Sequence, residues 1–167
     1  MNLTSLIKAC LSQDRVSQRV LYDRYKDSLY TVAIRLTDDK MLAADILQET
    51  FIEAFRQLAN LRQPEYFHSW VKKILVRKAY RHLDNNKKNV ELNEVTFPST
   101  MEMSDVSYIE KAIQSLPYKS RTVFVMAEIE GFSHKEIAEE LGVTVGTSKS
   151  QLNYAKTKLK AMLASYR

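Results

Sequence analysis

The chain has 167 residues, enough for one domain or two small ones, and 45% of them are hydrophobic, as in ordinary globular proteins. Lysine and arginine number 25 against 20 aspartates and glutamates, which gives a formal net charge of +5. Glycine occurs only three times, at Gly131, Gly142 and Gly146. Phosphate-binding loops need glycine where the backbone approaches the phosphate. The first 130 residues contain no glycine, which excludes a P-loop and a GxGxxG turn there.

Cysteine and histidine show no metal-binding or redox pattern. The single Cys10 excludes a disulfide framework and a cysteine-based zinc site, and its apolar neighbours favour a buried thiol over a nucleophile. The three histidines are scattered without ligand spacing. We therefore expect no metal, no cofactor and no catalytic residue. No apolar run approaches the roughly 18 residues of a membrane helix, and the N-terminus lacks a signal-peptide pattern, which predicts a cytoplasmic protein without membrane insertion.

Charge divides the chain into three parts. Residues 1–88 carry 16 basic and 10 acidic side chains, whereas residues 89–110 carry five acids and no base. Residues 111–167 carry nine bases and five acids. The acidic stretch contains Pro98 among serines and threonines and lacks strong apolar periodicity, which is typical of a linker. The sequence thus predicts two modules joined by an acidic flexible linker.

The apolar spacing of the first module predicts four helices and no strand. The first covers residues 3–11, and the second runs from Val20 to Leu36. Asp38 or Asp39 is positioned to cap a third helix over residues 40–60, and Pro64 opens a fourth. The fold class is all-α.

The third helix has a second stripe, opposite its apolar face. Its members follow one another at three- and four-residue steps: Asp45, Gln48, Glu49, Ile52 and Arg56. Such a stripe is either the solvent-facing side of a helix or a surface for another protein. The apolar Ile52 in its middle is a feature of protein interfaces.

The fourth helix is strongly basic and carries interleaved aromatic residues. Residues 66–88 hold seven bases and one acid. Basic side chains follow a phosphate backbone and aromatic faces stack on unpaired bases, so the segment suits single-stranded nucleic acid. Phe67, Trp70 and Ile74 also fit a plain core function. The candidate contacts are Lys72, Lys73, Arg77, Lys78, Tyr80 and Arg81.

The second module contains the sharpest local pattern. Ser133 and Glu136 form a potential capping box, Gly142 can end a short helix with positive φ, and Thr144 can cap the next one. Two helices joined by a glycine turn are typical of a helix-turn-helix. The pattern also fits an αα-hairpin that makes no DNA contact.

Charge favours DNA binding by the last helix. From Val143 onward there are five bases and no acid, which favours a polyanionic partner. Candidate groove contacts lie off its buried stripe: Thr147, Lys149, Ser150, Asn153, Tyr154 and Lys156.

Four stretches, in this order and spacing, resemble the extracytoplasmic-function (ECF, group 4) sigma factors of bacterial RNA polymerase. They are LYDRYKDSLYTVAIRL at 21–36, ADILQETFIEAFRQL at 44–58, WVKKILVRKAYRHLD at 70–84 and the long stretch 116–159. DILQETF and GFSHKEIAEELG…GTSKSQL are two different signatures of that family on one short chain. The resemblance covers nearly the whole chain except the acidic linker.

The resemblance implies a sigma region 2 helical bundle over 1–88, a linker over 89–106 and a region 4 helix-turn-helix over 107–167. It implies that the Asp45–Arg56 stripe binds the β′ clamp helices of core polymerase and that 66–88 reads and opens the minus-10 element. The last helix would read the minus-35 element, and 117–131 would lie near the β-flap tip. An anti-sigma factor is implied as a partner, with a monomeric free protein and a nucleoid-associated holoenzyme.

The sequence departs from the family pattern at several positions. Ala44 stands where Glu is frequent, Arg77 where Asn is frequent, Arg81 where Asp is common, and Asp84 where Arg is common. Base preference at the minus-10 element is therefore not carried over. Two alternatives come from other classes. One is a helix-turn-helix regulator acting without core polymerase, which would dimerise and bind duplex DNA tightly. The other is an all-α enzyme, which would need a cluster of catalytic groups.

Overall fold

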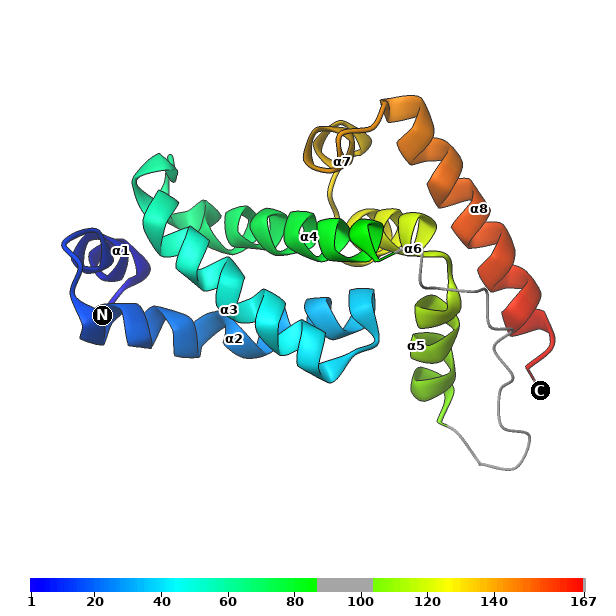
Figure 1. Cartoon of the computed structure of the whole chain (residues 1–167), viewed down its shortest axis with the longest axis horizontal. Helices are drawn as coiled ribbons and strands as arrows, with labels where there is room; N and C mark the ends of the chain where they lie inside the picture. Colours follow the sequence, from blue (N-terminus) through cyan, green and yellow to red (C-terminus); the bar gives the residue numbers. More distant parts are fainter. Residues whose placement is uncertain (87–103, 167) are drawn as a thin grey trace. The chain divides into compact units, whose positions relative to one another are not determined.

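The structure is a computed structural model that describes residues 1–86 and 104–166 (Figure 1). Every regular element in these ranges is helical, which confirms the predicted all-α fold. The chain divides into two compact units, Met1–Ala79 and Tyr80–Arg167, with the boundary inside one helix. Most of the predicted linker 89–106 lies outside the described residues. No described helix is long and apolar enough to cross a membrane.

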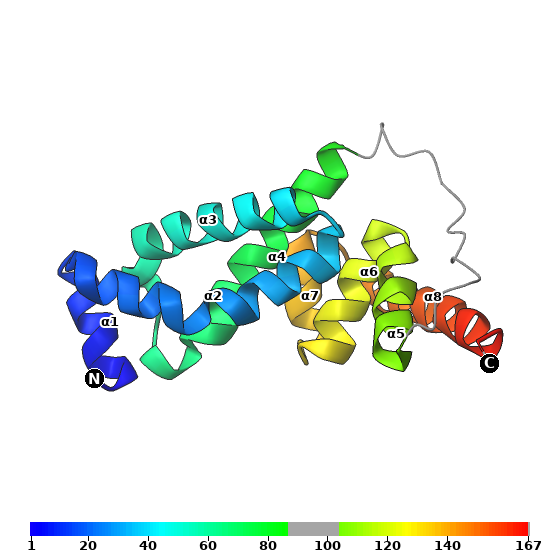
Figure 2. The same cartoon turned by 90° about the horizontal axis from the view of Figure 1, so that it is seen from below.

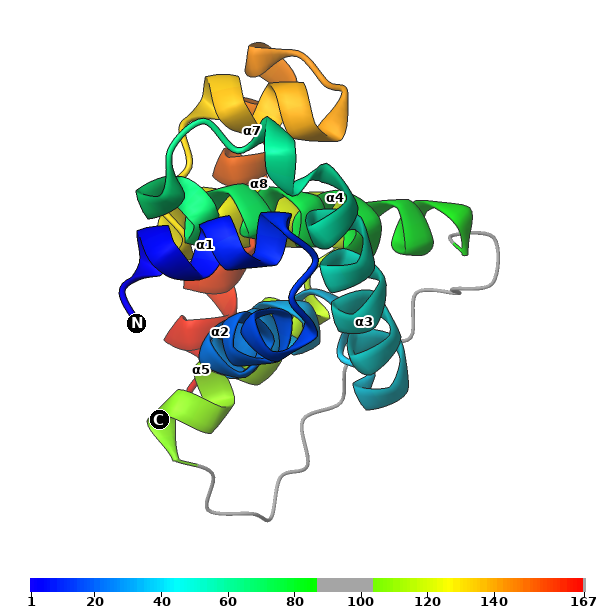
Figure 3. The ribbon, with the colours of Figure 1, turned by 90° about the vertical axis from the view of Figure 1, so that its left-hand side faces the viewer.

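The first unit contains four α-helices and two short 3-10 turns. Figure 2 shows α2 and α3 side by side, and in Figure 3 α1 lies across the N-terminal end of α2. The elements are α1 (Leu3–Leu11), α2 (Arg15–Thr37), α3 (Lys40–Gln57), η1 (Leu58–Asn60), η2 (Pro64–Tyr66) and α4 (Phe67–Asn85).

Side-chain caps set where these helices begin. Asp39 is the N-cap of α3 and accepts a hydrogen bond from the Leu42 amide, while Asp38 ends α2 in the left-handed region at φ 50°. The expected start of the second helix at Val20 is wrong. The helix begins at Arg15 because Asp14 caps it, accepting hydrogen bonds from both the amide and the hydroxyl of Ser17.

The core of the first unit is formed by the apolar faces of α2, α3 and α4. Leu21 and Leu29 of α2, Ile46 of α3, and Phe67 and Leu75 of α4 are fully buried. Burial of these apolar side chains away from water stabilises the packing of the three helices. The candidate binding residues of α3 lie on its remaining, exposed face, whereas most of those of α4 are half-buried.

The second unit is built around one long helix. Its elements are α5 (Asp105–Ser115), α6 (Tyr118–Phe124), a π-helical turn η4 (Val125–Ile129), α7 (His134–Leu141) and α8 (Val145–Ala164). Helix α8 packs against α5, α6 and α7. The buried Arg121 donates hydrogen bonds to the carbonyls of Gln114 (2.6 Å) and Leu116 (3.2 Å), which satisfies the C-terminal end of α5.

The predicted helix-turn-helix is confirmed in its details. Ser133 and Glu136 form the complete capping box, Gly142 has φ 67°, and Thr144 caps α8. A hydrogen bond of 2.7 Å between His134 Nδ1 and the fully buried Ser148 hydroxyl joins the start of α7 to α8. The angle between the two helices is therefore set by a glycine turn and a buried polar contact together.

Candidate functional site

The stripe predicted on α3 is exposed along its whole length. Asp45, Gln48, Glu49, Ile52 and Arg56 all face solvent in the free protein, while Ile46 and Phe51 of the same helix are buried. The Ile52 side chain is 60% exposed. An apolar side chain surrounded by polar ones on an exposed helix face has the composition of a protein interface.

Sequence reasoning missed one member of this surface. Met41 lies one turn before Asp45 and is 81% exposed. Residues four apart on a helix share a face, so Met41 continues the stripe toward the start of α3. The four-residue spacing from Met41 to Asp45, and the eleven-residue spacing to Ile52, could have indicated that Met41 lies on this face. The face from Met41 to Arg56 is called the α3 stripe below.

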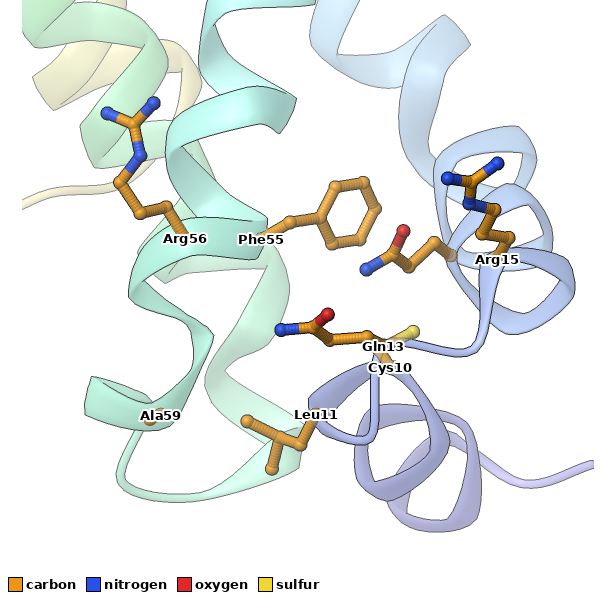
Figure 4. A pocket seen from close by; sticks show the side chains of 8 residues that line it. Cys10, Leu11, Gln13, Arg15, Phe55, Arg56 and Ala59 are labelled. Atoms are coloured by element: carbon orange, nitrogen blue, oxygen red, sulfur yellow. The ribbon is translucent and has the colours of Figure 1, made fainter.

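The end of the α3 stripe borders a hollow of about 320 Å³ (Figure 4). Its lining comes from the end of α1, the α1–α2 turn, the start of α2, the end of α3 and η1: Cys10, Leu11, Gln13, Arg15, Gln18, Phe55, Arg56 and Ala59. The Phe55 ring points from α3 into the space between these elements. The buried thiol expected at Cys10 is confirmed, and burial raises its pKa, which keeps it protonated and unreactive.

The candidate DNA contacts on α4 differ in how available they are. Arg81 is exposed, whereas the other five are half-buried: Lys72, Lys73, Arg77, Lys78 and Tyr80. Lys78 Nζ lies 2.5 Å from Glu53 Oε2, and Arg77 lies 3.5 Å from Glu53 Oε1. The hydrogen bond from Lys78, together with the positive charges of Lys78 and Arg77, lowers the pKa of Glu53 and keeps it ionised. Two of the six candidates therefore share a carboxylate on α3.

All six candidates on α8 are exposed. Thr147 and Ser150 use their side chains locally, in hydrogen bonds with the Thr144 hydroxyl and the Gly146 carbonyl. Lys149 and Asn153 form no such side-chain bond within the described part of the chain and project from the N-terminal half of α8. This half of a recognition helix is the one that enters the major groove.

Lys156 is the exception among these six, because it is paired. Its ammonium lies 2.8 Å from Glu128 Oε1, and Glu128 belongs to the π-helical turn η4. In this turn the Glu130 amide bonds to the Val125 carbonyl at 2.9 Å, five residues back. No sequence pattern indicates a π turn, so sequence reasoning missed the pairing of this turn with α8.

A second hollow, of about 460 Å³, lies beside the same helix. It is lined by Pro117, Tyr118, Lys119 and Ser120 at the start of α6 and by Ser150, Gln151 and Tyr154 of α8. Two of the candidate DNA contacts, Ser150 and Tyr154, thus share a concave surface with the basic Lys119. The predicted recognition face extends from α8 onto the start of α6.

Comparison with known families gives one match to each unit. Residues 21–89 match the family model for sigma-70 region 2, and residues 107–159 match that for sigma-70 region 4. The α3 stripe and the whole of α4 fall within the first match, and the helix-turn-helix falls within the second. The domain boundaries expected at 88 and 107 stay a prediction.

Curated sigma factors match the chain over most of its length. The chain is 27% identical over 170 residues to the RNA polymerase sigma-H factor of Pseudomonas aeruginosa, covering 90% of this chain and 88% of the relative. It is 30% identical to the RNA polymerase sigma factor SigV of Bacillus subtilis, covering 77% of this chain and 80% of that protein.

A solved structure shares the fold. It is the sigma factor RpoE in complex with the anti-sigma factor NepR from Bartonella quintana, which covers 89% of this chain and 98% of that one with a TM-score of 0.61 and 23% identity. The likeness extends over both units.

Proposed function

The chain belongs to the extracytoplasmic-function class of sigma-70 RNA polymerase sigma factors. We propose that three of its surfaces bind core polymerase, the minus-10 element and the minus-35 element, respectively. As a sigma factor it is not an enzyme: it binds core RNA polymerase and directs promoter-specific initiation. The observation that carries the proposal is the presence of both sigma regions on one chain, each with a candidate surface exposed.

The α3 stripe is the proposed surface for the β′ clamp helices of core polymerase. The charged side chains of Asp45, Glu49 and Arg56 surround the apolar Ile52. In such an interface the charges at the rim orient the partner, and the apolar centre is removed from water on binding. Met41 extends the apolar part of this surface.

Helix α4 is the proposed minus-10 segment. An unpaired base stacked on Tyr80, with its phosphates near Arg81, Lys72 and Lys73, would offset the few kcal/mol needed to unstack that base. Arg81 is the most exposed base of this set, so it is the proposed primary phosphate contact.

Helix α8 is the proposed minus-35 recognition helix. Asn153 is assigned to a base edge and Lys149 to phosphate, because amide groups make paired hydrogen bonds to bases whereas an ammonium acts as a point charge. The segment 117–131 is proposed to lie near the β flap of polymerase.

Three further proposals concern the protein in the cell. An anti-sigma factor is proposed as a partner, supported by the structural relative solved with one. A cytoplasmic location is proposed, with the holoenzyme on the nucleoid. The free protein is proposed to be a monomer.

One experiment separates a sigma factor from a regulator that works without polymerase. The full-length protein is titrated into fluorescent promoter duplex with and without core polymerase. We expect monomeric protein, weak duplex binding alone, and an opened, high-affinity complex once core is added. Tight duplex binding by a dimer without core would instead establish the regulator.

The phosphate contact proposed for Lys149 gives the first prediction. Lys149→Ala should weaken holoenzyme binding to all minus-35 sequences alike and reduce the slope of log K against log salt by about 0.9, the value for one phosphate on B-DNA. Lys160→Ala, at an exposed base outside the proposed set, is the matched control and should leave the slope unchanged. A loss confined to one base sequence would contradict the phosphate assignment.

A further inference from the structure

Glu53 of α3 is the meeting point of the two helices that carry the proposed polymerase and minus-10 surfaces. Its carboxylate is 2.5 Å from Lys78 Nζ and 3.5 Å from Arg77, and it accepts a hydrogen bond of 3.0 Å from Gln57 Nε2. The side chains of Glu53 and Lys78 are only 22% and 18% exposed. The three side chains around Glu53 are called the Glu53 cluster.

The cluster lies where the packing of α4 against the first unit ends. Helix α4 is buried at Val71, Ile74, Leu75, Val76 and Ala79, and residues 80–85 include no buried side chain. Lys78 is therefore bound to α3 one residue before the last buried position. The residues that follow directly are Tyr80 and Arg81, the proposed base-stacking and phosphate groups.

The cluster also changes how much charge α4 can offer to DNA. Lys78 faces α3 rather than open solvent, and Glu53 cancels one of the two positive charges beside it. When a side-chain cation binds a phosphate, counterions are released from the nucleic acid. A cation that is already paired with a carboxylate releases fewer counterions than an unpaired cation. Lys78 is thus poorly placed as a DNA contact, although the sequence made it a candidate.

We propose that Glu53 is a positioning residue of the strand-opening segment: it anchors the C-terminal half of α4 on α3 and withholds Lys78 from single-stranded DNA. The inference rests on the proposed function of α4 and deepens it. In this proposal the Glu53 carboxylate has two effects. It sets the positions of Tyr80 and Arg81, and it reduces the number of cations that face the DNA strand.

The two effects of Glu53 have opposite signs in a Glu53→Gln variant. Gln keeps the shape and the contact with Gln57 but releases Lys78, so the full-length protein should bind fluorescent oligothymidine more tightly. The salt slope should become steeper by about 0.7, the increment for one phosphate on a single strand. Promoter opening by the holoenzyme should fall roughly tenfold, because a small displacement of Tyr80 and Arg81 from their binding positions strongly weakens their contacts with the opened strand.

The matched control is Glu65→Gln, which removes the same charge from an exposed side chain of η2 outside the cluster. It should leave both the oligothymidine salt slope and promoter opening unchanged. Opening is compared on duplex and on a template with a pre-melted bubble, and only the duplex should show the loss in Glu53→Gln. A Glu53→Gln protein in which binding and opening both rise, both fall or both stay constant overturns the proposal.

A second pair of variants tests the cluster without changing Glu53. Lys78→Gln should leave the oligothymidine salt slope as it is, since its charge is already paired, whereas Arg81→Gln should reduce that slope by about 0.7. A reduction by Lys78→Gln equal to that of Arg81→Gln would place Lys78 on the strand and overturn the proposal. Lys78 and Arg81 lie on α4 and not on the α3 stripe, so both variants should bind core polymerase at wild-type strength. The proposed sigma function is judged separately by the wild-type holoenzyme.

Discussion

Ile52→Glu is expected to abolish binding to core RNA polymerase. Ile52 is 60% exposed in the free protein, so a glutamate there can remain hydrated and the first unit should keep its helix content. At the centre of an interface the same carboxylate would be desolvated without a partner, at a cost of roughly 3 kcal/mol, which weakens binding about a hundredfold or more. Titration of labelled protein into core polymerase measures the change.

The matched control for Ile52→Glu is Val16→Glu. Val16 is also an exposed apolar residue of the first unit, 72% exposed, but it belongs to α2 and not to the α3 stripe. It should bind core at wild-type strength, and circular dichroism should show the same helix content for both variants. Wild-type binding by Ile52→Glu would remove α3 from the polymerase interface.

Asn153→Ala is expected to relax base preference at one position of the minus-35 element. Loss of a paired hydrogen bond to a base edge costs about 1–3 kcal/mol, so the preferred duplex should lose roughly 5- to 150-fold in affinity while the other three bases change little. Asn153 is exposed on α8, so its removal leaves the packing of the second unit intact. Holoenzyme binding to four duplexes that differ only at that base pair gives the measurement.

Thr157→Ala serves as the control for Asn153→Ala. Thr157 is exposed one turn further along α8, and its hydroxyl donates to the Asn153 carbonyl rather than projecting as a free group. The order of base preference should be unchanged in this variant. An equal loss on all four duplexes with Asn153→Ala would mean that this residue contacts the backbone or that α8 lies differently in the groove.

The features that could be predicted from the sequence are those encoded within one or two turns of chain. Ser133, Glu136 and Gly142 specify the ends of α7 by local hydrogen bonds and backbone freedom, and the structure has them as expected. The apolar period of α3 likewise indicated which residues face outward, including Ile52. Helix α2 begins earlier than expected because the polar Ser17, Gln18 and Arg19 interrupt the apolar period before Val20, and because Asp14 caps the helix.

The pairing of charges between helices could not be predicted from the sequence. Glu53 and Lys78 are 25 positions apart, and which base a carboxylate meets depends on how α3 and α4 pack. The same holds for Glu128 and Lys156, which lie on a π-helical turn and on α8 and are 28 positions apart. Candidate contacts chosen by charge alone therefore included bases that the folded protein already pairs.

Run-off transcription tests the central claim most directly. Purified core polymerase is given genomic DNA with the wild-type protein, with Ile52→Glu or with neither, and the transcript ends are mapped. We expect a set of start sites that appears only with the wild-type protein, each preceded by shared minus-10 and minus-35 elements, and that disappears with Ile52→Glu. Identical transcripts with and without the protein would contradict its assignment as the promoter-selecting subunit.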